Sequence, residues 1–222
     1  VGADVICEKP VVLNPWNIEP LQELEQESGK RIYTVLQLRL HPILIDLKAK
    51  LGKDPQKTKK DIELTYITTR GPWYLASWKG QLERSGGLAT NIGIHFFDLL
   101  IWLFGSVEHS EVHIANPVKT SGYLELAGAR VKWFLSIDKG DLPQECKKNN
   151  KSTHRLILLD GEKIEFSEGF TDLHTTVYKE ILSGKGFGLE DALPSIVLAY
   201  DIRNAKPIGI TKNSHPYLKK IG

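Results

Sequence analysis

Three polar residues interrupt an apolar run from Gly87 to Gly105, and their types suit proton transfer. His95 carries the side chain best suited to accept a hydroxyl proton near neutral pH. Asn91 lies four residues before it, so the two side chains would share one face of a helix, and Asp98 follows at helical spacing. We predict that His95 is a catalytic residue and that Asn91 orients its imidazole.

The helix that would carry His95 is predicted over residues 88–104. Its apolar residues recur at the spacing of a buried helix face: Leu88, Ile92, Phe96, Leu99 and Leu103. An imidazole in such a helix can also be a core histidine that its neighbours satisfy, and spacing alone does not separate the two interpretations. Gly86 and Gly87 favour the functional one, because glycines let the backbone turn sharply and approach a ligand closely.

A second candidate ends the first predicted strand. Residues 3–8 have the pattern of a buried strand that finishes at Glu8, and Lys9 and Pro10 follow it. Ligands of open α/β sheets bind at the carboxyl ends of strands, where the ammonium group of Lys9 would point a positive charge into the cleft. The bond between Lys9 and Pro10 can be cis. The competing interpretation is a surface lysine in a loop.

Residues 70–79 combine cations with aromatic rings. Arg70 and Lys79 suit pairing with phosphate or carboxylate, and the aromatic side chains suit stacking on a ring. The same aromatic side chains can also simply pack the loop against the sheet. Gln37, Arg39 and His41 alternate along the end of the second predicted strand and could face the same cleft. The predicted substrate-binding residues are Gln37, Arg39, Arg70, Trp73, Tyr74, Trp78, Lys79, Asn91 and His95.

Three alternating residues, His109, Glu111 and His113, could share one face of a strand. Side chains of these types can hold a metal ion. Val112 and Ile114 would occupy the opposite face as core, so we predict a solvated strand face here and assign no metal site.

A βαβ unit must position Lys9. The predicted strand, helix and strand span residues 3–8, 15–29 and 31–38. Asn14, or Asn17 if the regular helix begins later, would cap the helix, and Gly29 would end it. A βαβ unit belongs in a parallel sheet. Because two strands do not make such a sheet, we expect the rest of it before Val1.

The pattern changes after residue 42. Helices are predicted near residues 43–52, 88–104, 171–183 and 190–204, and strands near residues 61–69, 110–116, 121–127, 130–138, 154–159 and 163–167. Asp160-Gly161 and, more weakly, Ala127-Gly128 are typical of hairpin turns. A meander of strands with helices to one side is an α+β domain.

Composition excludes several classes of protein. The chain is 41% hydrophobic and 25% charged with a formal net charge of +2, and its basic residues are scattered, so we expect no nucleic acid or anionic membrane partner. An uninterrupted apolar run of bilayer length is missing, and the first residues do not have the pattern of a secretory signal. Cys7 and Cys146 make no disulfide framework, which favours a cytoplasmic setting.

Taken together, these residues resemble the glucose–fructose oxidoreductase/inositol dehydrogenase (Gfo/Idh/MocA) family of NAD(P)-dependent sugar dehydrogenases. The matching pieces are Glu8-Lys9-Pro10, Arg39 with Pro42, Gly86-Gly87, Asn91-x-Gly93-x-His95-x-x-Asp98, Trp102-Leu103-x-Gly105 and Glu190-Asp191-Ala192. They cover nearly the whole chain, and they are specific as a set, although no one piece is.

The resemblance implies a two-domain enzyme. Residues 1–40 would be the C-terminal remnant of a Rossmann domain whose glycine-rich fingerprint lies before Val1, so these residues alone would lack much of the dinucleotide site. Residues 41–222 would be an α+β domain with an open antiparallel sheet and helices on one face. The sheet would form a dimer or tetramer interface. The cofactor would be NAD or NADP, since the discriminating residue would also lie upstream.

The resemblance also implies roles for particular residues. Lys9 and His95 would be the catalytic pair, in either order of roles, and Glu8, Lys9 and Pro10 would contact the cofactor. The family often has Asp where this chain has Asn91, and the missing charge would make His95 a weaker base.

Within the family, residues 33–42, 70–74 and 89–98 look most like the dehydrogenases that oxidise the C3 hydroxyl of UDP-N-acetylglucosaminuronate for surface polysaccharide synthesis. Such a nucleotide-linked sugar acid would explain the cations Arg39, Arg70 and Lys79 near predicted cleft loops. The alternatives are another sugar or inositol dehydrogenase of the family, or a non-catalytic relative that binds sugar nucleotides.

Overall fold

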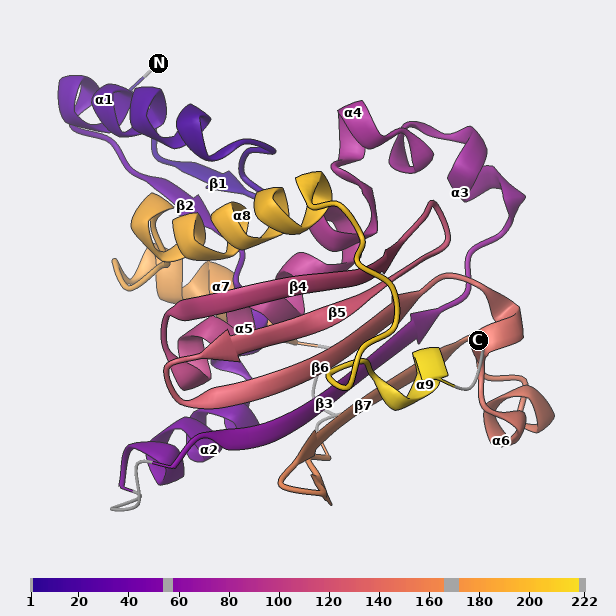
Figure 1. The fold of residues 1–222 in the computed structure, drawn as a ribbon. Coiled ribbons are helices and arrows are strands. Elements are labelled where there is room, and N and C mark those ends of the chain that lie inside the picture. The colour runs from indigo at the N-terminus through magenta and orange to yellow at the C-terminus, as the bar shows by residue number, and fades with distance from the viewer. Residues whose placement is uncertain (1, 54–57, 166–171, 220–222) are drawn as a thin grey trace.

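The computed structural model describes residues 2–53, 58–165 and 172–219, and it contains two sheets. The smaller sheet pairs β1 (Val5–Cys7) with β2 (Ile32–Thr34) in parallel, and the larger one has six strands. Figure 1 shows the small sheet and α1 (Ile18–Ser28) beside one end of the large sheet, next to α8 (Leu189–Asn204). The predicted combination of a βαβ piece and an α+β body is confirmed.

The βαβ unit is shorter than its sequence pattern predicts. The chain makes a 3-10 turn, η1 (Pro15–Asn17), before α1 begins after Asn17, so the later of the two predicted starts is confirmed, although the Asn17 side chain makes no cap hydrogen bond. Gly29 ends the helix with φ 63°. The predicted strand over 31–38 is wrong in its second half, because residues 37–40 form a 3-10 helix, η2 (Gln37–Leu40).

The six-stranded sheet has the order β4-β5-β6-β3-β7-β8. Its strands are β3 (Lys60–Thr68), β4 (Val107–Ala115), β5 (Lys119–Leu126), β6 (Ala129–Ser136), β7 (Thr153–Leu159) and β8 (Glu162–Lys163). Neighbours are antiparallel except β3 and β6, so the sheet is not a simple meander.

Both predicted hairpin turns are confirmed. Ala127 and Gly128 separate β5 from β6, and Asp160 and Gly161, with φ 51° and 86°, separate β7 from β8. Residues 166 and 167 of the last predicted strand lie outside the described residues.

The helices agree with the predicted ranges, apart from short turns. They are α2 (Pro42–Gly52), α3 (Pro72–Ala76), η3 (Trp78–Gly80), α4 (Leu82–Ser85), η4 (Ala89–Gly93), α5 (Ile94–Phe104), η5 (Lys139–Asp141), α6 (Gln144–Lys148), α7 (Leu173–Leu182), α8 and α9 (Pro216–Lys219). The helix predicted over 88–104 forms, but its first part, η4, is a π-helical turn. The first residue of the helix predicted over 171–183 lies outside the described residues.

The main core lies between the sheet and the helices on one of its faces. Phe97 of α5 and Trp133 of β6 are both fully buried and meet edge to face at 5.4 Å. The helical stretch Leu82–Phe104 is long and apolar enough to cross a bilayer, yet 72% of its most apolar window is buried inside the protein, as expected for a core helix. We interpret it as the central core helix of this domain.

The opposite face of the sheet is partly covered by residues 205–219, here named the C-terminal strap, which crosses in front of β5 and β6 in Figure 1. The strap N–H of Ile208 donates to the carbonyl of Val112 on β4. It covers His113, which is buried and lies 3.0 Å from a Glu111 carboxylate oxygen. The predicted solvated face is therefore wrong at His113, because a segment distant in sequence packs over it.

Candidate active site

The end of β1 and the π-helical turn η4 meet at Lys9. The bond between Lys9 and Pro10 is cis, and the Lys9 ammonium donates a 2.7 Å hydrogen bond to the backbone carbonyl of Asn91. Turns of π-helix are frequent at functional sites. Residues far apart in the sequence are thereby joined at the carboxyl end of a strand, where the sequence places a ligand cleft.

A cavity of 310 Å³ opens at this junction. It is lined by Lys9, Tyr66, Arg70, Trp73, Tyr74, Lys79, Asn91, Ile92 and His95. The structure thus brings most of the predicted site residues together. Tyr66 also lines the cavity, although the sequence did not predict it as a site residue. On β3 it follows Ile62 and Leu64 at alternate positions, a pattern typical of a core residue.

The two candidate catalytic groups carry different charges at neutral pH. Burial lowers the pKa of Lys9 to about 8, helped by Lys79 and opposed by Glu8. Burial, followed by the positive charges of Lys9 and Arg155 and by His174, lowers the pKa of His95 well below its usual value. Near pH 7 the site therefore holds an ammonium beside a neutral imidazole, which can accept a proton.

Asn91 is predicted to orient the His95 imidazole, but no hydrogen bond joins the two side chains. The Asn91 amide Nδ2 instead donates to the Tyr74 hydroxyl at 2.7 Å, and the His95 ring makes no hydrogen bond to the described residues. Tyr74 is 3% exposed, and burial raises the pKa of its phenol. The π-helical turn changes the spacing that a regular helix would give, so a separation of four residues no longer guarantees contact.

Arg39 forms ion pairs within the protein and does not line the cavity. Its Nε and Nη2 donate to both oxygens of Asp98, at 3.0 and 2.7 Å, and its Nη1 donates to Asp191 at 3.0 Å. Arg39 is 7% exposed, so this buried pair joins η2 to α5 and α8. Gln37 and Trp78 do not line the cavity either. Gln37 lies on the 3-10 helix η2, which replaces the predicted end of the strand.

Glu8 faces solvent more than the cavity. Its carboxylate lies 3.2 Å from Nε2 of His174 on α7, and both side chains are about half exposed. Glu8 therefore remains available at the end of β1, next to the cis bond, where a cofactor contact is predicted.

The glycine turn before the central helix has the sharp geometry that the sequence predicts. Gly86 and Gly87 have φ 71° and 72°. A Cβ on Gly86 would come within 2.5 Å of the Thr90 hydroxyl oxygen, so no larger residue fits without displacing the helix start. This turn lets residues 88–95 pass directly behind the cavity.

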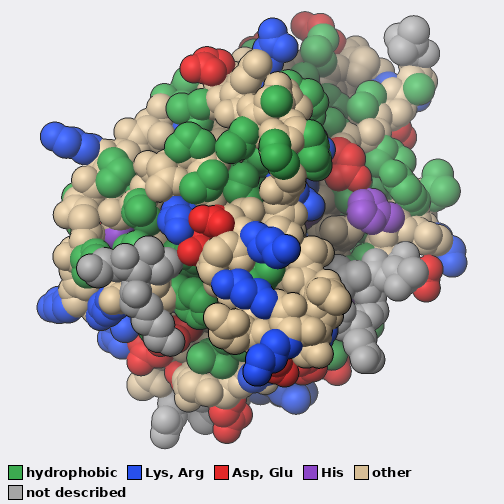
Figure 2. Space-filling view, turned by 90° about the vertical axis from the view of Figure 1, so that its right-hand side faces the viewer, with side chains coloured by type: hydrophobic (Ala, Val, Ile, Leu, Met, Phe, Trp, Pro, Cys, Tyr) green, Lys and Arg blue, Asp and Glu red, His purple; other side chains and the backbone are tan. Residues whose placement is uncertain are grey.

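The segment of α3, η3 and α4 presents large hydrophobic side chains beside the cavity. Trp73, Leu75, Trp78 and Leu82 are each about half exposed. Hydrophobic side chains gather in the upper half of the face shown in Figure 2, the side on which this segment lies in Figure 1. The Lys79 ammonium lies 5.9 Å from the centre of the Trp73 ring, so the predicted combination of cation and aromatic side chain is present.

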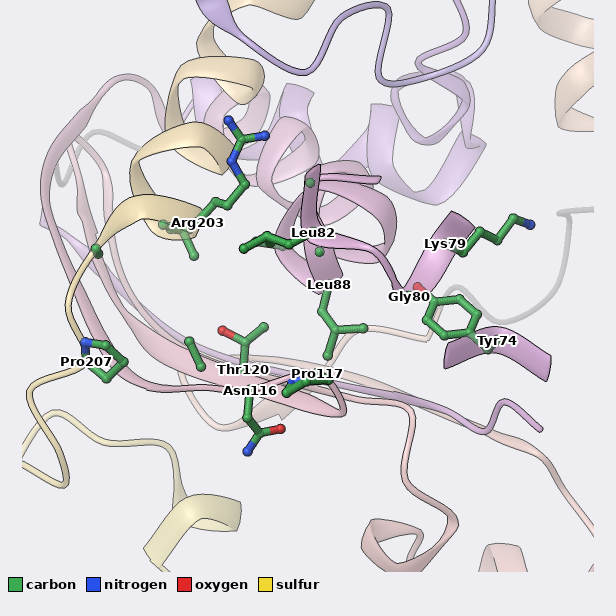
Figure 3. Close-up of a pocket in the computed structure, with 16 residues that line it drawn as sticks. Tyr74, Lys79, Gly80, Leu82, Leu88, Asn116, Pro117, Thr120, Arg203 and Pro207 are labelled. Atoms are coloured by element: carbon green, nitrogen blue, oxygen red, sulfur yellow. The ribbon is translucent and has the colours of Figure 1, made fainter. Parts of the chain in front are cut away.

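A second cavity of 390 Å³ adjoins the first and shares Tyr74 and Lys79 with it (Figure 3). Three of its polar side chains already have hydrogen-bond partners within the protein. Thr120 donates to a backbone carbonyl at 3.1 Å, Asn116 accepts two backbone N–H groups, and Arg203 donates to a neighbouring side chain at 2.7 Å. The chemistry is therefore concentrated in the smaller cavity.

Comparisons with known proteins identify the family. The model of the Gfo/Idh/MocA "oxidoreductase family, C-terminal alpha/beta domain" matches residues 60–140. The chain is 30% identical over 155 residues to YteT of Bacillus subtilis (strain 168), whose name describes it as an oxidoreductase; the match covers 68% of this chain and 34% of YteT.

Solved structures agree. The WlbA (WbpB) dehydrogenase from Thermus thermophilus is 53% identical, with a TM-score of 0.93 over 97% of this chain and 70% of that chain, in its complex with NAD and alpha-ketoglutarate. The same enzyme in complex with NAD and UDP-GlcNAcA gives a TM-score of 0.92. The WlbA dehydrogenase from Bordetella pertussis, at 20% identity and a TM-score of 0.71, shares the fold. The chain belongs to the Gfo/Idh/MocA family of oxidoreductases.

Proposed function

We propose that this protein is an NAD-dependent dehydrogenase that oxidises the C3 hydroxyl of UDP-N-acetylglucosaminuronate (UDP-GlcNAcA). The observation that carries the proposal is the convergence of Lys9 and His95 on one cavity that also presents Arg70 and Lys79. The 53% identical Thermus enzyme, which binds NAD and UDP-GlcNAcA, supports the choice of cofactor and substrate.

His95 accepts the proton of the C3 hydroxyl, because its imidazole is neutral at the pH where the Lys9 ammonium is charged. Lys9 donates to the same oxygen and stabilises the negative charge that develops there. The backbone carbonyl of Asn91 holds the Lys9 ammonium in place. The structure therefore favours one of the two orders of roles that the sequence leaves open, with His95 as base and Lys9 as electrostatic stabiliser.

The nicotinamide end of NAD fits the end of β1, where Glu8, Lys9 and Pro10 would hold it beside the cavity. One observation supports this fit: the Glu8 carboxylate, which follows β1, is more than half exposed to solvent. Bound NAD supplies the hydride acceptor. Residues 1–40 would then belong to the dinucleotide-binding domain and residues 41–222 to the substrate domain.

Arg70 and Lys79 bind the negative groups of the substrate. Among the described residues neither cation forms an ion pair with a carboxylate, so both can make charge-assisted hydrogen bonds to a carboxylate or phosphate of the substrate. Trp73 offers a ring for stacking at the same edge. Gln37 and Arg39 are no longer included among the substrate-binding residues.

The 2-oxo acid in the other Thermus complex favours a second half-reaction in the same cavity. The ketone of a 2-oxo acid would take up the hydride at its carbonyl carbon and a proton at its oxygen, giving a 2-hydroxy acid. His95 would return that proton.

We also infer a homo-oligomer, a dimer or tetramer formed through the sheet face away from the helices. We further infer a cytoplasmic role in making surface polysaccharide sugars.

The proposal is tested by measuring NADH formation with UDP-GlcNAcA, UDP-GlcNAc, free glucuronate and inositol, each with NAD and with NADP. We expect UDP-GlcNAcA with NAD to give the highest kcat/KM. A higher kcat/KM with inositol or a free sugar would assign a different dehydrogenase. Binding of UDP-GlcNAcA without any turnover would instead support the non-catalytic relative.

A further inference from the structure

Tyr74 has a hydroxyl group whose proton has no acceptor within the described chain. The phenol is buried, lines both cavities, and its oxygen receives the hydrogen bond from Asn91 Nδ2 at 2.7 Å. Because that oxygen acts as acceptor toward Asn91, its own O–H remains to be donated elsewhere. Figure 3 shows the Tyr74 ring between the α3 ribbon and the segment of Lys79 and Gly80. Tyr74 and Lys79 line both cavities.

A buried donor without an acceptor is uncommon in folded proteins. In this cavity the protein groups around the phenol are mostly donors as well: the ammonium groups of Lys9 and Lys79, and the guanidinium of Arg70. A ligand bound in the cavity would supply the missing acceptor. The combination of one neutral and several charged donors fits an anionic oxygen, such as a carboxylate.

We propose that Tyr74 is a substrate-selecting residue that donates its hydroxyl proton to the carboxylate of the sugar acid, beside Arg70. This inference rests on the proposed function and sharpens it. Asn91 is the positioning residue for this contact. Its amide fixes the phenol as donor, and its neutral side chain keeps negative charge away from the substrate carboxylate.

Asn91 also connects the carboxylate site to the reacting centre. Its side chain holds Tyr74, and its backbone carbonyl holds the Lys9 ammonium at 2.7 Å. A sugar whose carboxylate is held by Tyr74 is therefore placed relative to the group that polarises its hydroxyl. A hydrogen bond from Tyr74 to the acid would therefore contribute to binding and, by positioning the sugar, to the rate of the chemical step.

Tyr74→Phe tests the proposal, because it removes only the hydroxyl. Equilibrium binding of UDP-GlcNAcA and of UDP-GlcNAc, which has a hydroxymethyl group in place of the carboxylate, is measured in the wild type and the variant without NAD. We expect the affinity for the acid to fall about 10-fold or more, and the affinity for UDP-GlcNAc to change by less than about twofold. Tyr123→Phe on β5, outside both cavities, is the matched control and should change neither.

Asn91→Asp is the second arm. A carboxylate at this position would accept the Tyr74 proton and repel the acid, so the preference for UDP-GlcNAcA over UDP-GlcNAc should fall further. Equal loss of both ligands in Tyr74→Phe, or an unchanged preference in both variants, would overturn the role of Tyr74. Failure of the wild-type enzyme to oxidise UDP-GlcNAcA while it still prefers to bind the acid would overturn the proposed reaction and leave the selecting role of Tyr74 supported.

Discussion

Two groups of ionisable residues lie along or beside the central helix, and they differ in whether they already have a partner of opposite charge. Asp98 is held by Arg39, which also binds Asp191, so one guanidinium pairs with two carboxylates inside the fold. His95, three residues before Asp98, makes no hydrogen bond to the described residues. Among the same residues, the Lys9 ammonium donates to a backbone carbonyl and forms no ion pair. Arg39 and Asp98 are buried, and Lys9 and His95 are partly buried. Burial therefore does not identify a functional charge; the absence of a compensating partner does.

We expect the largest effect from a substitution of His95, which belongs to the group without a partner of opposite charge. His95→Ala should lower kcat by about 10²- to 10⁴-fold, because a positioned general base contributes about that much. Its melting temperature should stay close to that of the wild type, since the imidazole makes no hydrogen bond to the described chain. The measurement is steady-state NADH formation with UDP-GlcNAcA.

His109→Ala on β4 is the matched control for that experiment. His109 is exposed and paired with Glu111 at 3.2 Å, away from the cavity, so its loss should leave kcat unchanged. A wild-type kcat in His95→Ala would remove the imidazole from the mechanism and place the chemistry on Lys9 alone.

At the paired group, substitution should affect folding. Arg39→Met leaves Asp98 buried without a counter-charge, which should cost about 3–5 kcal/mol in the free energy of unfolding. Urea unfolding followed by circular dichroism gives this value. Arg130→Met removes an arginine whose nearest carboxylate, on Asp61, lies 3.7 Å away on the exposed surface, and should cost less than about 1 kcal/mol. Arg39→Met could instead have the same free energy of unfolding as Arg130→Met and bind UDP-GlcNAcA poorly. That result would contradict the structural role assigned to Arg39 and place it at the substrate site.

A smaller, graded effect should appear with pH. The pKa of Lys9 is lowered to about 8, so its ammonium is charged below that pH and is lost above it. Because the pKa of His95 lies well below its usual value, its imidazole stays neutral throughout the range. We expect kcat/KM to be flat between about pH 6.5 and 7.5 and to fall about tenfold per pH unit well above 8.

Lys9→Arg keeps a positive charge at all these pH values and should lose the alkaline fall, even if its rate is lower. An alkaline fall that persists at the same pH in Lys9→Arg would assign it to another group, such as a substrate hydroxyl.

Local sequence patterns predicted most elements of the fold. Periodicity located α5, α7 and α8, and the turn pairs at 127–128 and 160–161 located both hairpins. The errors have physical causes. Gln37 and Arg39 read as strand, but Arg39 binds carboxylates on α5 and α8, and residues 37–40 form a 3-10 turn. His113 alternates like an exposed residue, but the C-terminal strap covers it.

By itself, the sequence determined which groups are present and on which elements they sit: an imidazole in an apolar helix, an ammonium after a strand, and cations among aromatic rings. Only the tertiary structure decided which of these charges are neutralised within the fold. Ion pairs such as Arg39–Asp98 join residues far apart in the chain, and no local pattern encodes them, because spacing specifies neighbours along one element and not contacts between elements. The same reason explains why Asn91 holds Tyr74, from another helix, and not His95 one turn away.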